Sequence, residues 1–389
     1  MFHCPGRREF LKSTAAAAVA GAGAGGLVPG VLKGGADKGG QAAHATDIPS
    51  GVKEYRRGGM LYRRLGRTDL FVSLLGFGSH TDPRYRRSSP LGSELTDEGQ
   101  ARRDRQIAKA LDHGTNLVDV YNNAGQWAPM SRLVKGRRDS VLVSLCRQLP
   151  GALGQIVDDG VRLFGGYVDL YRIYLGDGAG PSAQDLEDWD VMRKAKAAGK
   201  VRAIGISTHS ERMMTACLDE FEGLDYVMFP YNFIHAKADY AEFLPKAIER
   251  GVGLIAIKPL AAGSIVKLDP RAQVTSVPEN ERVTVYNTRE KVLLPEVVRQ
   301  LAQSLDQHPD ETLAQAALRF VFSRPFMSAA VPGMFQEHEV DENFAALTRH
   351  LQLARTGGKV LDSARRVALA SNRRWLPARY RWLDDWRRA

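Results

Sequence analysis

The feature that most constrains the fold of this chain is a series of eight short apolar runs that alternate with segments of helical periodicity. Each run has four to seven residues, rich in Val, Ile, Leu and aromatic side chains, with few polar interruptions. Strands of this kind are buried on both faces, as in a parallel sheet that is covered by helices. The runs are residues 72–77, 116–120, 141–145, 168–174, 202–206, 226–229, 253–257 and 327–331.

The segments between these runs carry apolar residues at helical spacing, most clearly at 106–112, 185–198, 210–221, 240–250, 294–305 and 313–322. This alternation predicts the α/β class, and eight strands predict a single (β/α)8 TIM barrel over residues 60–350. A doubly wound open sheet is the alternative, but no strand is followed by the G-x-G-x-x-G pattern of that fold. The polar residues 267–295 follow the seventh run, so we expect a lid or rim loop there.

The first 45 residues are typical of an export signal. The pair Arg7-Arg8 precedes a weakly apolar run of Ala and Gly at 13–28, and residues 43–45 (AHA) form a candidate cleavage site. We predict a twin-arginine (Tat) signal peptide and Gly/Ala-rich spacer at 1–45 and a linker at 46–59; a chance arginine pair is the alternative. Because the Tat machinery exports folded proteins, we expect it as a partner and the periplasm or cell envelope as the location.

Composition narrows the partners of the chain. Its 389 residues are 44% hydrophobic and 25% charged, as in globular proteins. The sequence contains no uninterrupted stretch of about 18 apolar residues, which is the length that a membrane-spanning helix needs. The net charge of +10 suggests anionic partners, but a nucleic acid has little support beyond this charge. Three cysteines exclude a disulfide scaffold, and we expect Cys146 and Cys217 to be free thiols.

Residues 351–389 lie beyond the barrel and are predicted to form a helical C-terminal extension. The last part, residues 372–389, holds six arginines and four aromatic residues. A basic aromatic stretch can bind an anionic polymer or a membrane surface. We favour instead an amphipathic tail that packs on the barrel.

Ten short motifs follow one another from residue 60 to residue 343. They are 60–68 (MLYRRLGRT), 72–78 (VSLLGFG), 116–119 (NLVD), 135–139 (KGRRD), 168–171 (VDLY), 201–207 (VRAIGIS), 258–263 (KPLAAG), 315–320 (QAALRF), 331–334 (VPGM) and 342–343 (EN). In this order they resemble the motifs of the aldo-keto reductase family. The resemblance implies a barrel that moves a hydride between NADPH or NADH and a carbonyl or alcohol, with the cofactor lying across the carboxyl ends of the strands.

The resemblance also implies a catalytic tetrad of Asp, Tyr, Lys and His, in which the tyrosine protonates the developing alkoxide. Asp119 keeps its place in this tetrad. The positions of the tyrosine, lysine and histidine fall on Ala124, Cys146 and Tyr174. Without the lysine, a buried Asp119 costs several kcal/mol unless Arg147, another cation or water compensates its charge.

Two other tyrosine positions are available for the proton transfer. We hypothesise that Tyr174 or Tyr121 donates the proton and that Asp119 orients the donor. Arg147 would then stabilise a phenolate or an alkoxide. The alternative is that both tyrosines only line a pocket for a sugar or an aromatic ligand.

The resemblance assigns further residues to the cofactor. Ser207 and Thr208 correspond to the pair that holds the nicotinamide amide. Glu339 stands where an arginine is expected at the 2′-phosphate of NADPH, so we expect NADH to bind slightly better. No cysteine follows Cys217, so we expect no iron–sulfur cluster of the family's C-terminal type. The other assignments are Lys258, Pro259 and Leu260 on the pyrophosphate side and Gly333, Met334, Glu342 and Asn343 on the adenosine side.

Two functions of other classes remain open on the sequence. His80, His209 and His235 each follow a predicted strand, so a Zn²⁺ site with Asp119 for hydrolysis or isomerisation is one alternative. A non-catalytic ligand-binding barrel of the envelope is the other, because reduced nicotinamide is not regenerated outside the cytoplasm. We favour an oxidoreductase of a carbonyl, alcohol or sugar-like substrate, with a rebuilt or degenerate proton-donor site and no metal.

Overall fold

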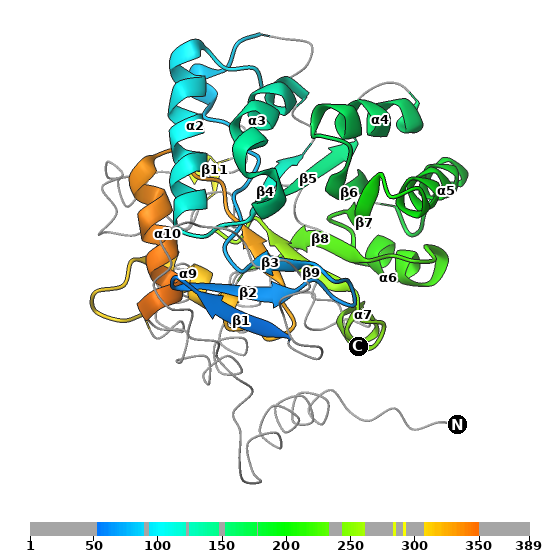
Figure 1. The fold of residues 1–389 in the computed structure, drawn as a ribbon. Coiled ribbons are helices and arrows are strands. Elements are labelled where there is room, and N and C mark those ends of the chain that lie inside the picture. Colours follow the sequence, from blue (N-terminus) through cyan, green and yellow to red (C-terminus); the bar gives the residue numbers. More distant parts are fainter. Residues whose placement is uncertain are drawn as a thin grey trace, which may run out of the picture. The chain divides into compact units, whose positions relative to one another are not determined.

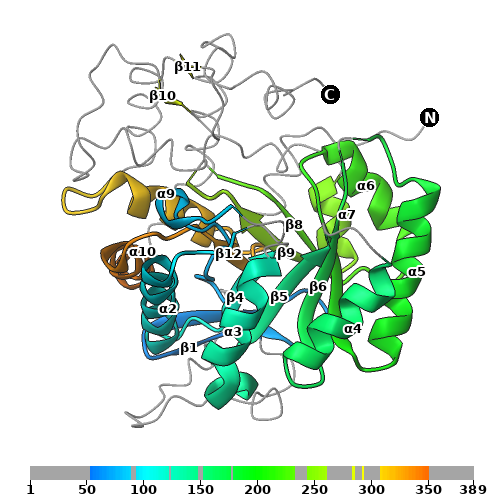
Figure 2. The same cartoon turned by 90° about the horizontal axis from the view of Figure 1, so that it is seen from above.

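Seven parallel strands form the centre of the computed structural model, in the order β12-β9-β8-β7-β6-β5-β4. Helices surround these strands (Figures 1 and 2). The structure describes residues 53–88, 93–121, 124–147, 152–176, 178–232, 243–260, 283–284, 291–292 and 307–349. The seven strands are β4 (Leu117–Tyr121), β5 (Leu142–Arg147), β6 (Val168–Tyr174), β7 (Val201–Ser207), β8 (Tyr226–Pro230), β9 (Gly253–Ile257) and β12 (Ala329–Val331).

Residues 74–78 take the eighth position and nearly close the barrel. The amide of Gly76 donates to Ala330 O and the amide of Phe77 donates to Leu117 O, each at 2.8 Å, so this segment bridges β12 and β4. It continues from β3 (Phe71–Ser73), which forms a separate antiparallel sheet with β1 (Glu54–Arg57) and β2 (Met60–Arg64). The predicted barrel is therefore confirmed, with isolated bridges in place of a regular first strand.

Eight helices of the described residues accompany the strands. Five of the six predicted helical segments overlap a helix, and residues 294–305 lie outside the described residues. The first helix begins earlier than predicted, because its amino-terminal half (DEGQARRDR) is polar and shows no apolar period; Thr96 accepts from the Gly99 amide and caps it. The helices are α2 (Asp97–Asp112), α3 (Trp127–Val134), α4 (Leu153–Leu163), α5 (Ala183–Ala197), α6 (Glu211–Glu220), α7 (Phe243–Glu249), α9 (Leu313–Phe322) and α10 (Glu337–Arg349).

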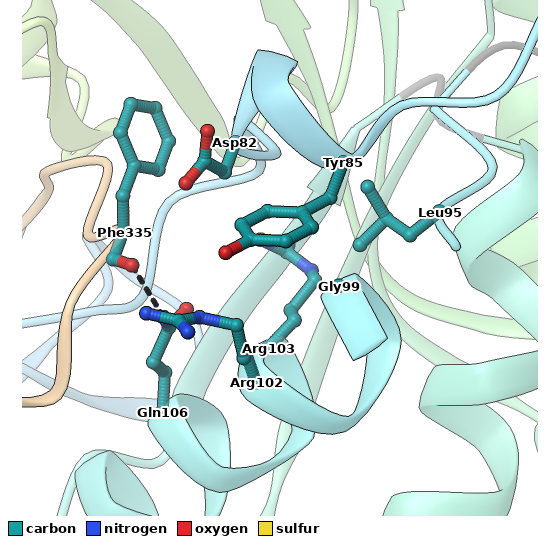
Figure 3. Close-up of a pocket in the computed structure, with 8 residues that line it drawn as sticks. All are labelled: Asp82, Tyr85, Leu95, Gly99, Arg102, Arg103, Gln106 and Phe335. Carbon is teal, nitrogen blue, oxygen red and sulfur yellow. Dashed lines mark hydrogen bonds between the residues drawn. The ribbon is translucent and has the colours of Figure 1, made fainter. Parts of the chain in front are cut away.

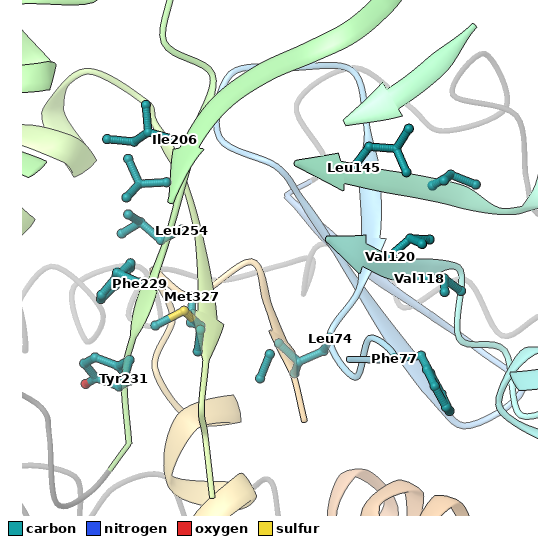
Figure 4. Packing of buried hydrophobic residues seen from close by; sticks show 14 of the residues in the cluster. Leu74, Phe77, Val118, Val120, Leu145, Ile206, Phe229, Tyr231, Leu254 and Met327 are labelled. Atoms are coloured by element: carbon teal, nitrogen blue, oxygen red, sulfur yellow. The ribbon is translucent and has the colours of Figure 1, made fainter. Parts of the chain in front are cut away.

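Alternate residues of each strand contribute to two apolar clusters. One cluster joins the strands to the helices and includes Phe77, Val118 and Leu254, which Figure 4 shows among its members. The other cluster includes Leu117 and Leu170 and fills the barrel interior. Each such aliphatic or phenyl side chain contributes about 1.5–3 kcal/mol when it is fully buried.

Polar side chains at the amino-terminal ends of the strands fix the strands to one another. We call this end of the barrel the foot. Asp169, in β6, accepts from Arg138 Nη1 at 2.8 Å, from Arg202 Nη1 at 2.9 Å and from the Val143 amide at 2.9 Å. The VDLY and KGRRD motifs therefore have a structural role here, since they supply this aspartate and one of its arginines.

The structure also bears on the predictions for the cysteines, the rim loop and the terminal segments. Cys146 and Cys217 are buried free thiols, as predicted. Within the predicted rim loop the structure describes β10 (Val283–Thr284) and β11 (Lys291–Val292), which pair antiparallel. The predicted signal, the first half of the predicted linker and the C-terminal extension lie outside the described residues, and the second half of the linker contains β1. No helix of the described ranges has the length and apolar character of a membrane span.

Candidate active site

The carboxyl ends of the strands, which we call the mouth, bring together most of the predicted site residues. Active sites of (β/α)8 barrels lie at this end. Asp119 and Tyr121 come from the end of β4, Cys146 from β5 and Tyr174 from β6. Ser207 ends β7. Arg147 ends β5, but its side chain lies outside the described residues.

A buried arginine compensates the charge of Asp119. Arg172 Nη1 donates to Asp119 Oδ1 at 2.8 Å, and Arg172 Nη2 donates to Asp119 Oδ2 at 3.1 Å. Nη1 also donates to the hydroxyl of Ser144 at 2.7 Å. The side chains of Arg172 and Asp119 are only 1% and 4% exposed. Arg172 is thus the other cation that could compensate Asp119, and it comes from β6, two strands away from β4 in the barrel.

Arg172 was not among the predicted site residues, although the sequence held a signal for it. It is a charged residue within the apolar run 168–174. It lies two positions from both Leu170 and Tyr174, so all three side chains are on the same face of the strand. Burial is the largest single influence and lowers the pKa of this guanidinium, but the charge and hydrogen bonds of Asp119, together with Cys146 and Tyr226, raise the pKa by more. Arg172 therefore stays charged, and its two hydrogen bonds hold the Asp119 carboxylate in place.

The strand next to Arg172 has a glycine, Gly205, whose lack of a side chain leaves space for the Tyr226 ring. Gly205 pairs with Arg172 on one side and with Tyr226 on the other. A Cβ at Gly205 would lie 2.6 Å from Tyr226 Cε1, so the tyrosine ring occupies the space that any side chain at this position would need.

The tyrosine and cysteine nearest to Asp119 are held in their neutral forms. The centroid of the Tyr121 ring lies 5.2 Å from the Arg172 guanidinium carbon. Burial is the largest cause that raises the pKa of the Tyr121 phenol, and the neighbouring Cys146 adds to the effect. Burial also raises the pKa of the Cys146 thiol, to about 12. Cys146 therefore does not replace the charge of the family's lysine.

A second group of mouth residues surrounds His209. Lys258 Nζ lies 2.7 Å from His209 Nε2, and the rings of His209 and Tyr174 meet edge to face with centroids 6.2 Å apart. Lys258 follows β9 with φ of 53°, and Asn232 Nδ2 donates to its carbonyl at 2.9 Å. Tyr121 also has a positive φ, 54°. Two strained non-glycine residues at one end of a barrel indicate a functional site.

The other predicted cofactor residues are more dispersed. The Thr208 hydroxyl accepts from the Ser210 amide at 3.1 Å, so this oxygen already has a structural partner. Glu342 Oε1 accepts from the Thr312 hydroxyl at 2.5 Å and thereby joins α10 to the start of α9. Glu339 Oε2 accepts from the amides of Phe335 and Gln336 at 2.5 and 3.1 Å. Met334 and Asn343 are buried, and Gly333 is exposed.

The described residues contain no group of three or more metal-ligating side chains. His80 and His209 follow the first barrel position and β7, as expected, but His235 lies outside the described residues. His209 Nε2 contacts the Lys258 ammonium, which competes with a metal for that nitrogen. The structure adds no support to the zinc alternative.

A hollow beside the first loop of the mouth is separate from these residues (Figure 3). It encloses about 230 Å³ of empty space, part of it open to solvent. Gln106 Nε2 donates to Phe335 O at 2.6 Å at its edge. It is lined by Asp82, Tyr85, Leu95, Gly99, Arg102, Arg103, Gln106 and Phe335. Because no predicted catalytic residue lines it, the hollow is not the predicted active site.

The chain is similar to known proteins both in sequence and in fold. The chain is 26% identical to a probable voltage-gated potassium channel subunit beta of Arabidopsis thaliana, over 74% of this chain and 91% of that protein. It is 23% identical to L-galactose dehydrogenase of the same plant, over 74% and 88%. The structure resembles the holo form of an aldo-keto reductase from Bacillus halodurans with a TM-score of 0.60 and 21% identity, covering 78% of this chain and 95% of that one.

A family model gives the assignment directly. The model of the aldo/keto reductase family matches residues 96–356, which is more than half of the chain and spans the barrel from α2 to beyond α10. An aldo-keto reductase from Klebsiella pneumoniae in complex with NADP and acetate shares the fold with a TM-score of 0.53 and 18% identity, over 75% and 93% of the two chains. The chain belongs to the aldo/keto reductase family.

Proposed function

We propose that this protein is an NAD(P)-dependent oxidoreductase that interconverts a carbonyl and an alcohol, with a rebuilt proton-donor site. The observation that carries the proposal is the bidentate pair of Arg172 and Asp119 at the mouth. It retains the family's aspartate as a compensated, fixed charge although the lysine is replaced by Cys146. A barrel that had lost its chemistry would have no need to keep a buried carboxylate at this position.

The donors at the mouth fit a dinucleotide. Lys258 provides an ammonium group for the pyrophosphate, Ser207 provides a hydroxyl for the nicotinamide amide, and Gly333 presents an exposed backbone without a side chain. The bound nicotinamide would supply or accept the hydride. Glu339 keeps a negative charge near the adenosine side, so we propose a slight preference for NADH, although this carboxylate is also engaged by two amides.

Tyr174 is the proton donor in this proposal. It occupies the position of the family's histidine at the end of β6, and its ring touches His209, which in turn contacts the Lys258 ammonium. The positive charge behind the histidine favours the phenolate that remains after proton donation. Tyr121 is the second candidate, but burial raises the pKa of its phenol.

The proposal includes export. Residues 1–45 carry the features of a Tat signal, and the Tat route would deliver a folded barrel with its cofactor to the periplasm or cell envelope. Secretion of a reporter fused to residues 1–45, and its retention when Arg7 and Arg8 are both replaced by lysine, would support this part.

Nucleotide binding and turnover test the proposal. Purified protein is titrated with NADH and NADPH by tryptophan fluorescence and calorimetry, and turnover is then measured on aldehydes, ketones and sugars. We expect saturable binding, tighter for NADH, and a loss of about 100-fold or more in kcat for Tyr174→Phe. Absence of binding of either nucleotide would instead support the ligand-binding alternative. Turnover that is unchanged in both Tyr174→Phe and Tyr121→Phe would refute the proposed donors.

A further inference from the structure

Two arginines at the first loop of the mouth bind only neutral oxygen atoms. Arg86 donates from Nε to the Thr81 hydroxyl at 2.8 Å and from Nη2 to the Thr81 carbonyl at 2.6 Å. Arg103, from α2, donates to the carbonyl oxygen atoms of His80 at 3.0 Å and Ser79 at 3.4 Å. Among the described residues neither guanidinium forms an ion pair with a carboxylate, and both are held by oxygen atoms of residues 79–81.

The two arginines differ in their access to solvent. Arg103 is only 5% exposed, and its guanidinium carbon also lies over the Phe77 ring, 5.4 Å from the ring centroid. It therefore acts as a fixed charge behind the loop. Arg86 is exposed, and Nη1 of Arg86 takes part in none of its bonds to Thr81. Arg86 thus offers a free pair of N–H donors in an orientation that Thr81 fixes.

The electrostatic surroundings of His80 show how these charges are arranged. Desolvation is the largest cause that lowers the pKa of His80, and the positive charges of Lys258, Arg86 and Arg103 lower it further. Of the groups with the largest effect on this pKa, Asp119 opposes them, and its charge is balanced by the bidentate contact to Arg172. Three positive charges therefore lie within electrostatic reach of His80.

We infer that the substrate of this protein carries a carboxylate or phosphate group, which binds beside His80 with Arg86 as its principal donor. The inference rests on the proposed function and adds the substrate class to it. A planar guanidinium held by Thr81 is suited to paired N–H···O contacts with either anion, and the buried charge of Arg103 adds attraction without direct contact. The carbonyl group of the same substrate would then extend towards Asp119.

Paired substrates test the inference. Glyceraldehyde is compared with glyceraldehyde 3-phosphate, and butyraldehyde with succinic semialdehyde, so that each pair adds one anion and the two pairs separate phosphate from carboxylate. We expect kcat/KM to favour the anionic member of at least one pair by about 10-fold or more, with the preference weakening as salt is added. Equal kcat/KM values within both pairs, in a protein that binds NADH and reduces aldehydes, would overturn the inference and leave the proposed function intact.

Matched variants locate the anion. Arg86→Gln is compared with Arg84→Gln, which removes an arginine two positions away that pairs with Asp82. We expect Arg86→Gln to reduce the preference for the anionic substrate by about 10- to 100-fold, mainly through KM, and Arg84→Gln to leave it unchanged. Equal losses in both variants would contradict a specific role of Arg86. A loss of NADH affinity in Arg86→Gln as large as the loss for the anionic substrate would assign Arg86 to the cofactor and overturn the inference.

A direct titration covers the case in which the protein reduces none of these aldehydes. Glycerol 3-phosphate and succinate are titrated calorimetrically into the full chain and into both variants. Saturable binding that Arg86→Gln weakens at least 10-fold, with no nucleotide binding, would retain the anion site and refute the redox function. Absence of binding of both anions would overturn the inference.

Discussion

The foot and the mouth of the barrel each contain a buried aspartate held by arginine, but they obtain it in different ways. At the foot, Asp169 pairs with two arginines whose side chains are 13% and 36% exposed, and the VDLY and KGRRD motifs supply the aspartate and one arginine. At the mouth, Asp119 pairs with one arginine that is almost completely buried and that no motif of the resemblance includes. The foot pair therefore uses residues of the motifs that resemble the family, whereas the mouth pair uses an arginine outside those motifs.

The backbone shows the same contrast along β9. Before this strand, at the foot, positive φ angles fall on glycines such as Gly251 (φ 64°), and Gly66 (φ 55°) packs against the same turn. Directly after the strand, at the mouth, the positive φ falls on Lys258. Glycine adopts a positive φ without backbone strain, so the foot turn is unstrained. Lys258 carries this strain at the mouth, where its side chain contacts His209.

The largest effect is expected from Arg172→Leu. The substitution leaves Asp119 as an uncompensated buried charge, so we expect a loss of about 3–5 kcal/mol in the free energy of unfolding, measured by urea denaturation. The double variant Asp119→Asn/Arg172→Leu is the control, because it removes both charges together. We expect it to recover most of the lost stability but no turnover. Equal destabilisation in the single and double variants would show that shape, not charge, holds this region.

A glycine at the foot tests the backbone half of the comparison. Gly66→Ala places a Cβ 2.3 Å from the carbonyl oxygen of Gly251 at a φ that disfavours alanine, so we expect a loss of about 2–4 kcal/mol. Gly58→Ala is the matched control, with φ of 56° and no atom within 4 Å of the added Cβ. It should lose only about 1 kcal/mol. Similar losses in both variants would mean that the close contact has no cost of its own.

The foot aspartate is expected to affect stability without affecting the site. Asp169→Asn weakens two charged hydrogen bonds to arginines that also have solvent or carbonyl partners, so we expect a loss of about 1–3 kcal/mol with unchanged NADH affinity. Asp112→Asn, which breaks the exposed pair with Arg137, should change stability by less than about 0.5 kcal/mol. A change in NADH affinity in Asp169→Asn would show that the two ends are coupled.

Local sequence patterns predicted the scaffold better than the mouth. The runs 168–174 and 253–257 coincide with β6 and β9 because a doubly buried strand must be apolar throughout. The amino-terminal half of α2 escaped prediction because it is polar on all sides. Arg172 escaped because its partner lies 53 residues away, on another strand, and no local period encodes such a pairing. The contact of Lys258 with His209 depends on a backbone angle that lysine seldom adopts.

The smallest expected effect is a change in the titration of His80, and it joins the mouth electrostatics to the proposed anion site. A histidine whose pKa is lowered in the folded protein stays neutral while the unfolded chain takes up a proton, so its contribution to stability is present above the ordinary value of 6.5 and is lost as the pH falls through the window below it. Arg86→Gln removes one of the charges that lower this pKa, so the His80 pKa should rise and the loss of stability in this window should become shallower. The shift of the His80 imidazole signals, followed by NMR from pH 4 to pH 8, measures this directly.

Arg84→Gln serves as the control, since Asp82 already balances its charge. If the His80 pKa were the same in Arg86→Gln and in the parent protein, the charge of Arg86 would not reach the imidazole, and the mouth would be no more cationic at this edge than the foot.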